Sequence, residues 1–233
     1  MRRILITNDD GIQSPGLIRL VRTASALGKV SVIAPDGQRS AQSHSITLRK
    51  PIDLWPVRLP IDGVSAYACS GTPADCVRIG IAHLLKEKPD WVLSGINSGY
   101  NMGTDIQYSA TVGAAFEARI TGVPAIAVSE AASDNHGLTD AFLPGILADL
   151  VDRKLGAGEI FNVNFPAGRQ NDFRGILENR RVGRCPMYLA EYETVALQED
   201  GGIRVEVRGI LDDKSVLQDE ITGHLPAGTG RKV

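Results

Sequence analysis

The sequence is poor in cysteine, and its three cysteines, Cys69, Cys76 and Cys185, fit neither a CxxC motif nor the ligand spacing of a zinc site. A disulfide-rich secreted scaffold and a cysteine-based zinc site are therefore excluded. Reduced, partly buried thiols are expected instead, which indicates a cytoplasmic protein. The sequence also lacks any run approaching the ~20 apolar residues that span a bilayer, and its N-terminal apolar stretch is too short for a signal peptide.

An excess of charge of one sign is missing as well. The formal net charge is −2 over 233 residues, so neither nucleic acid nor an acidic membrane is an expected partner of the whole chain. The hydrophobic content of 43% and the charged content of 22% are ordinary for a globular protein and argue against disorder.

Strand-like and helix-like patterns alternate over the first two thirds of the sequence. Five short apolar runs are typical of strands buried on both faces: residues 4–7, 30–34, 91–94, 125–128 and 161–164. Helical patterns follow most of them, at residues 15–27 with Gly28 as the expected C-cap, 73–85 with Thr72 as the N-cap, 111–120 and 138–155. This alternation predicts an α/β fold, a Rossmann-like three-layer sandwich with a mostly parallel sheet.

Two regions depart from this alternation and define the expected domain organisation. Residues 46–69 carry β-like segments separated by prolines, which predicts a small β-hairpin inserted in a catalytic domain of residues 1–165. Residues 166–233 alternate in places like strands but offer too little for a second core, so we expect a C-terminal β-arm. We expect part of residues 170–215 to lie in the interface of a homodimer or homotetramer.

Unusually polar loops follow three of the predicted strands. They begin at Asn8, Pro35 and Gly95 and are rich in Asp, Asn, Ser and Gly. If the three strands are parallel, the loops converge on one edge of the sheet, where open α/β sheets bind ligands. Their oxygen donors suit Mg²⁺, Mn²⁺ or Ca²⁺ better than zinc.

Asp9 and Asp10 are adjacent in the first of these loops. Two neighbouring carboxylates repel each other unless a cation or strong hydrogen-bond donors compensate. An alternative interpretation is that one aspartate caps the following helix while the other is solvated.

An ordered set of motifs resembles the SurE (stationary-phase survival protein E) family of nucleotidases and covers about residues 1–165. The matching blocks are Thr7-Asn8-Asp9-Asp10-Gly11-Ile12, Ala34-Pro35-Asp36 with Arg39-Ser40, His44-Ser45-Ile46-Thr47, Ser70-Gly71-Thr72-Pro73-Ala74-Asp75-Cys76-Val77, Ser94-Gly95-Ile96-Asn97, Asn101-Met102-Gly103, Ser109 with Thr111-Val112-Gly113-Ala114-Ala115, and Gly122-Val123-Pro124. The resemblance implies hydrolysis of nucleoside 5′-monophosphates, and of 3′-monophosphates as well, by one divalent metal ion and an attacking water. Its metal ligands fall on Asp9, Asp10, Ser40 and Asn97.

Further residues are candidates for substrate binding and proton transfer. Ser109 and Thr111 begin a predicted helix, where hydroxyls and free amides would hold phosphate, although ordinary N-capping explains them too. His44 would donate a proton to the leaving alkoxide, or is simply solvated. Asn8 would orient water or a phosphate oxygen, or ties its turn. Gly95 would let the backbone approach a ligand near Asn97, and glycine is also common in loops for conformational reasons.

Two rival functions remain at this point. Asp9 could act as a nucleophile that forms an aspartyl-phosphate, but such enzymes carry a second aspartate two residues along, where this chain has Gly11. A regulatory module could bind nucleotides without turnover, but no GxGxxG follows the first strand, so a dinucleotide is disfavoured.

Overall fold

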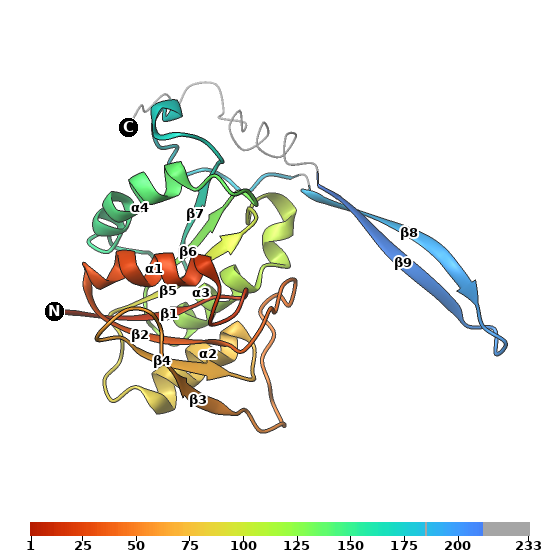
Figure 1. The fold of residues 1–233 in the computed structure, drawn as a ribbon, viewed down its shortest axis with the longest axis horizontal. Helices are drawn as coiled ribbons and strands as arrows, with labels where there is room; N and C mark the ends of the chain where they lie inside the picture. The colour runs from red at the N-terminus through yellow and green to blue at the C-terminus, as the bar shows by residue number, and fades with distance from the viewer. Residues whose placement is uncertain (185, 212–233) are drawn as a thin grey trace. The chain divides into compact units, whose positions relative to one another are not determined.

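The computed structural model of the protein describes residues 1–184 and 186–211 (Figure 1). The chain forms two compact units, which are described separately: Met1–Asn101 with Gln107–Arg174, and Met102–Ile106 with the chain from Gly175. Cys185 and residues 212–215, on which part of the predicted interface falls, lie outside the described residues.

The first unit is built on one seven-stranded sheet. In spatial order its strands are β3 (Leu54–Val57), β4 (Ser65–Cys69), β2 (Gly28–Pro35), β1 (Arg2–Thr7), β5 (Trp91–Ser98), β6 (Ala125–Glu130) and β7 (Phe161–Phe165). Every neighbouring pair is parallel except β3 and β4. The predicted α/β fold with a mostly parallel sheet is confirmed.

The helices lie where the sequence places them, with small differences at their ends. They are α1 (Pro15–Ser25), α2 (Pro73–Ile79) continued by the π-helical turn η1 (Gly80–Leu84), α3 (Ala110–Ile120) and α4 (Gly137–Leu150), besides the 3₁₀ turns η2 (Gly103–Gln107) and η3 (Gln170–Asp172). Thr72 caps α2 as predicted, through a hydrogen bond from the amide of Asp75. Gly28 as the C-cap of α1 is wrong: the cap is Ala26, and Gly28 already belongs to β2.

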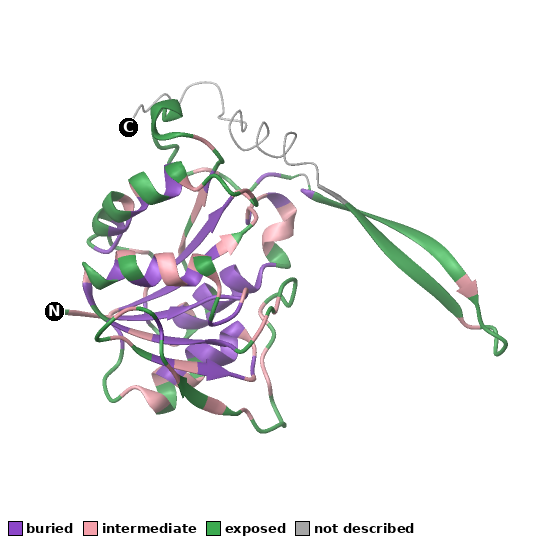
Figure 2. Ribbon diagram, in the orientation of Figure 1, coloured by how far each residue is buried: buried purple, intermediate pink, exposed green. Residues whose placement is uncertain are grey.

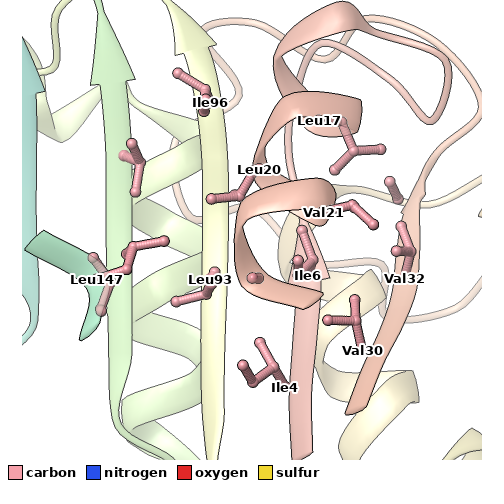
Figure 3. Packing of buried hydrophobic residues seen from close by; sticks show 14 of the residues in the cluster. Ile4, Ile6, Leu17, Leu20, Val21, Val30, Val32, Leu93, Ile96 and Leu147 are labelled. Atoms are coloured by element: carbon pink, nitrogen blue, oxygen red, sulfur yellow. The ribbon is translucent and has the colours of Figure 1, made fainter. Parts of the chain in front are cut away.

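The helices cover both faces of this sheet. Figure 3 shows Leu17 and Val21 of α1 on the side of β1 and β2, which carry Ile6 and Val32, and Leu20 over β5, in a core that α4 extends. On the opposite face η1 packs closely, because a side chain at Gly80 would meet Leu5 and Ile33 at 2.9 Å. Burial on both faces explains the continuous apolar runs of the central strands (Figure 2).

Strand order reverses at β1, which lies between β2 and β5. Such a switch point opens a crevice beyond the carboxyl ends of the strands, because the connections on its two sides leave in opposite directions. Asp9 and Asp10 follow β1 directly and therefore lie at this crevice.

The segment 46–69 forms the predicted antiparallel hairpin, and it extends the main sheet. β4 pairs in parallel with β2, and β3 is the edge strand, which tolerates the missing donor of Pro56. Residues 46–48, one of the β-like segments, form no strand, since they belong to the loop that continues from β2.

The second unit contains the predicted β-arm as a two-stranded antiparallel hairpin of β8 (Tyr188–Leu197) and β9 (Ile203–Leu211). Side chains alternate between its faces, and nearly all of them are exposed (Figure 2). No helix in the part of the chain that the structure describes is long and apolar enough to cross a membrane.

Substitution of Gly16, in the first turn of α1, tests whether the close approach of this helix to β5 is needed for stability. A Cβ atom there would lie 2.2 Å from the carbonyl oxygen of Ile96, so Gly16→Ala should lower the free energy of unfolding by about 1–3 kcal/mol. Urea denaturation measures the change.

Gly145 of α4 provides the matched control, because a Cβ there meets nothing within 4 Å. Gly145→Ala should be neutral or stabilising by up to about 1 kcal/mol, since alanine is the better helix former. Equal effects of the two substitutions would contradict the close approach.

Candidate active site

The turn after β1 is held by Asn8. Its amide Nδ2 donates to the carbonyl oxygen of Gly11 at 3.0 Å and to Ser14 Oγ at 2.7 Å, and the side chain is fully buried. Ser14 in turn caps α1 by accepting from the amide of Leu17 at 3.3 Å. This arrangement favours the turn-stabilising interpretation of Asn8 over contact with a substrate.

The loop after β2 is joined to this turn through the backbone. The amide of Arg39 donates to the carbonyl oxygen of Asp9 at 2.6 Å, and that of Ile12 donates to Pro35 at 2.8 Å. Gly11, at φ +100°, lets Gly37 approach to a distance at which a side chain would clash. These contacts bring the exposed Ser40, one residue after Arg39, to the Asp9 loop.

The loop after β5 reaches the same place. The amide of Ser98 donates to Asp10 Oδ2 at 3.3 Å. Asn97 donates through Nδ2 to the carbonyl oxygen of Gly99 at 2.8 Å, which turns one end of its amide to the backbone and leaves Oδ1 as an oxygen donor. Gly95 is buried, and a side chain there would meet the carbonyl oxygen of Val128 at 2.2 Å, so the close approach of β6 requires this glycine, and its approach to a ligand stays a prediction.

The start of α3 completes the site. Ser109 is the N-cap, and its Oγ accepts from the amide of Val112 at 3.0 Å, so the capping interpretation holds for this residue. The fully buried Thr111 donates its hydroxyl to Asp9 Oδ1 at 2.6 Å. Its hydroxyl hydrogen is donated to a carboxylate, which makes Thr111 a positioning residue for Asp9, and its place in a phosphate cradle stays a prediction.

The two carboxylates differ in their surroundings. Asp9 is only 4% exposed, and burial raises its pKa to about 6, although hydrogen bonds from Thr111 oppose the shift and the charge of Asp10 adds to it. Burial also raises the pKa of Asp10, against the hydrogen bond from Ser98. Ionisation of both carboxylates at the same time is therefore unfavourable unless a positive charge compensates.

The residues fit a divalent cation. In the part of the chain that the structure describes, no lysine or arginine pairs with Asp9 or Asp10, and the nearby Arg39 is taken by Asp36 at 2.7 Å. The donors that converge here are carboxylate, hydroxyl and amide oxygens, which Mg²⁺ and Mn²⁺ prefer. The site thus combines an uncompensated negative charge with oxygen ligands.

His44 is fixed by a residue that the sequence did not suggest. Its Nε2 lies 2.7 Å from Oε2 of Glu117, a buried carboxylate on α3. The loop lies directly on this helix, since a side chain at Gly113 would meet Ser43 and His44 within 3.0 Å. His44 is half-buried and oriented, so the interpretation as a merely solvated loop histidine is wrong.

A second group that sequence reasoning missed surrounds Glu130, at the end of β6. Arg19 of α1 contacts both Glu130 and Asp140 of α4, and His136 lies beside Glu130. Arg19 is separated from Glu130 by 111 positions in the sequence, whereas Glu130, His136 and Asp140 are close to one another along the chain. The available sequence signal was that Glu130 ends an apolar strand at the same edge of the sheet as Asp9.

Comparison with known proteins places this geometry in context. Residues 4–185 match the family described as "Survival protein SurE". The chain is similar to "5'-nucleotidase SurE" of Thermoanaerobacter sp. (strain X514), with 48% identity over 166 residues, 70% of this chain and 66% of that protein. It is 42% identical over 187 residues to the "5'-nucleotidase SurE" of Synechococcus sp. (strain JA-3-3Ab), covering 78% of this chain and 72% of the relative. The match to the first of these relatives thus spans slightly less than two thirds of its length.

A solved structure agrees with the fold. The "Crystal Structure of Sure Protein from Aquifex aeolicus" superposes with a TM-score of 0.72 at 34% identity, and the match covers 89% of this chain and 82% of that one.

The raised pKa of Asp9 predicts how the metal-free protein responds to pH. The folded chain keeps the Asp9 proton up to about pH 6, while the unfolded chain loses it near its ordinary pKa of about 4. The native state therefore binds more protons between these values, and the free energy of unfolding should fall by roughly 3 kcal/mol as pH rises through this window.

Asp9→Asn should remove this dependence and make the metal-free protein more stable than wild type at pH 7.5. Urea denaturation from pH 4 to 8 in EDTA measures it, with the exposed Asp62→Asn as control. A wild-type pH slope that persists in Asp9→Asn would contradict the prediction.

Proposed function

Because the chain belongs to the SurE family, we propose that it is a divalent-metal-dependent phosphomonoesterase that hydrolyses nucleoside 5′-monophosphates, and 3′-monophosphates as well, to nucleoside and phosphate. One observation carries the metal dependence: two adjacent carboxylates, one of them buried, lie at the switch point of a parallel sheet without a basic partner among the described residues.

Asp9, Asp10, Ser40 and Asn97 would hold the metal ion. A bound Mg²⁺ or Mn²⁺ would neutralise charge on the phosphoryl group and activate the attacking water. Ca²⁺ is a further ion that such ligands accept.

The protein's own groups then have separate tasks. The Thr111 hydroxyl fixes Asp9, so that this carboxylate keeps one orientation during the reaction. Asp9 or Asp10 accepts the proton of the attacking water. His44, oriented by Glu117, donates a proton to the leaving alkoxide, and the positive end of α3 at Ser109 attracts the phosphate.

Metal removal tests this proposal. EDTA should abolish hydrolysis of AMP, and Mn²⁺ or Mg²⁺ should restore it. Asp10→Asn should lower kcat/KM by orders of magnitude, because it removes a charged ligand at nearly constant volume.

A second readout separates metal binding from turnover. Mn²⁺ should raise the melting temperature of wild type and of Asp62→Asn, but not that of Asp10→Asn. Full activity in metal-free protein would overturn the proposal, and nucleotide binding without turnover would favour a regulatory module.

Residues 1–165 would form the catalytic domain and residues 166–233 an oligomerisation arm. The two faces of the hairpin support this division. One face carries exposed apolar and aromatic side chains, which the register places together: Tyr188, Tyr192, Val205 and Val207. On the other face Glu193 and Arg208 form an ion pair at 2.5 Å. A two-stranded hairpin is at best marginally stable alone, so its apolar face needs a covering surface. A second copy of the chain would supply it in a homodimer or homotetramer.

Charged residues on this face should disrupt the assembly. The double variant Tyr192→Glu, Val207→Glu should shift the mass in light scattering to that of a smaller species, because charges would have to be buried in the interface. Glu191→Gln on the other face serves as control and should leave the mass unchanged. A wild-type chain that is monomeric at micromolar concentration would refute the interface.

We also assign the protein to the cytoplasm. Cys69 and Cys76, the cysteines that the structure describes, are free and buried, which suits a reducing compartment.

A further inference from the structure

A cavity of about 640 Å³ adjoins the candidate metal site. Its wall includes Asp10 and Ser98 of that site, Pro15 and Arg19 of α1, Glu130 at the end of β6, and Asp134 in the segment that follows β6. This volume is in the usual range for a small-molecule site. Gln38, also in the wall, donates to Oγ of Ser40 at 3.1 Å, so the cavity and the proposed metal ligands share one rim.

The charges in the wall disfavour an anionic occupant. Arg19 is the only lysine or arginine among the described residues that line the cavity, and its guanidinium is already neutralised. It donates to Glu130 at 2.5 and 3.2 Å and to Asp140 at 2.6 and 2.8 Å. Asp10 and Asp134 add further negative charge, so a second phosphate group would be repelled there.

Glu130 is a fixed hydrogen-bond acceptor at this wall. Its side chain is buried, Arg19 holds both of its oxygens, and His136 Nδ1 lies 3.1 Å from Oε1 without the direction of a hydrogen bond. An ionised carboxylate accepts about four hydrogen bonds, so capacity for hydroxyl donors remains. Carboxylates at the strand ends of Rossmann-like sheets bind the ribose hydroxyls of nucleotides in this way.

We propose that this cavity binds the nucleoside part of the substrate, with Glu130, held by Arg19, accepting hydrogen bonds from the ribose hydroxyls. The inference rests on the proposed function, because a phosphate at the metal site places the attached sugar within reach of the wall that Asp10 shares. Pro15 and Ile96 supply the apolar surface that a base requires.

Substrates with and without a nucleoside test the assignment. Wild-type protein with Mn²⁺ is assayed with AMP and with p-nitrophenyl phosphate, which carries no sugar. Glu130→Gln should lower the ratio of the two kcat/KM values, AMP over p-nitrophenyl phosphate, by about tenfold, because a charged acceptor for hydroxyl groups is lost.

A second variant avoids disturbing the ion pair. Ala132 is exposed in the cavity wall, so Ala132→Trp fills space without removing a buried contact and should lower the same ratio by at least tenfold. The control is Ala157→Trp, an equally exposed alanine outside the cavity, which should leave both rates unchanged.

The outcomes separate this inference from the proposed function. A ratio that stays at the wild-type value in both folded variants overturns the nucleoside site while leaving the phosphatase intact. A wild-type chain inactive on both substrates with either metal overturns the proposed function. Calorimetry gives a second readout: adenosine should bind to wild type and not to Ala132→Trp, and an absence of binding to wild type would overturn the nucleoside site.

Discussion

Asp9 lies in the turn that follows the central strand β1, with its carboxylate buried and hydrogen-bonded to Thr111, and the rest of the site is arranged around this group. A buried carboxylate near neutral pH is unfavourable, as its pKa of about 6 indicates. Asp9 is held there by the hydroxyl of Thr111, which donates to its carboxylate, and by the amide of Arg39, which donates to its carbonyl oxygen. A cation bound as proposed would offset this unfavourable free energy, and the stability of the protein would then depend on metal occupancy.

The loops around Asp9 are held mainly by their backbones. The amides of Arg39 and Ser98 bond to Asp9 and Asp10, and glycines at 11 and 95 allow approaches that a side chain would prevent. Asn97 bonds to the backbone through Nδ2, which leaves its Oδ1 for a ligand, and Ser40 Oγ, which accepts from Gln38, retains a second lone pair. A preorganised site requires such a rigid frame, with donor and acceptor groups that remain available to a ligand.

Two carboxylates outside this centre, Glu117 and Glu130, each contact a basic side chain. Glu117 orients His44 on one side of α3, and Glu130 is held by Arg19 at the cavity. In each case a buried charge is paired, whereas Asp9 and Asp10 have no basic partner among the described residues. This contrast separates the carboxylates that have a basic partner from the two that are proposed to hold the metal.

The sequence by itself determined the parallel α/β fold, the order of its elements and the polar loops after strands 1, 2 and 5, because strand periodicity and helix caps are local signals. The tertiary structure decided the contacts that local signals do not encode. Thr111 donates a hydrogen bond to Asp9, and Gly95 allows β6 to approach. Arg19 pairs with Glu130 and Asp140, each more than a hundred residues away in the sequence. Such contacts depend on which elements the sheet order brings together, and that order is fixed by packing over the whole chain and not by any one segment.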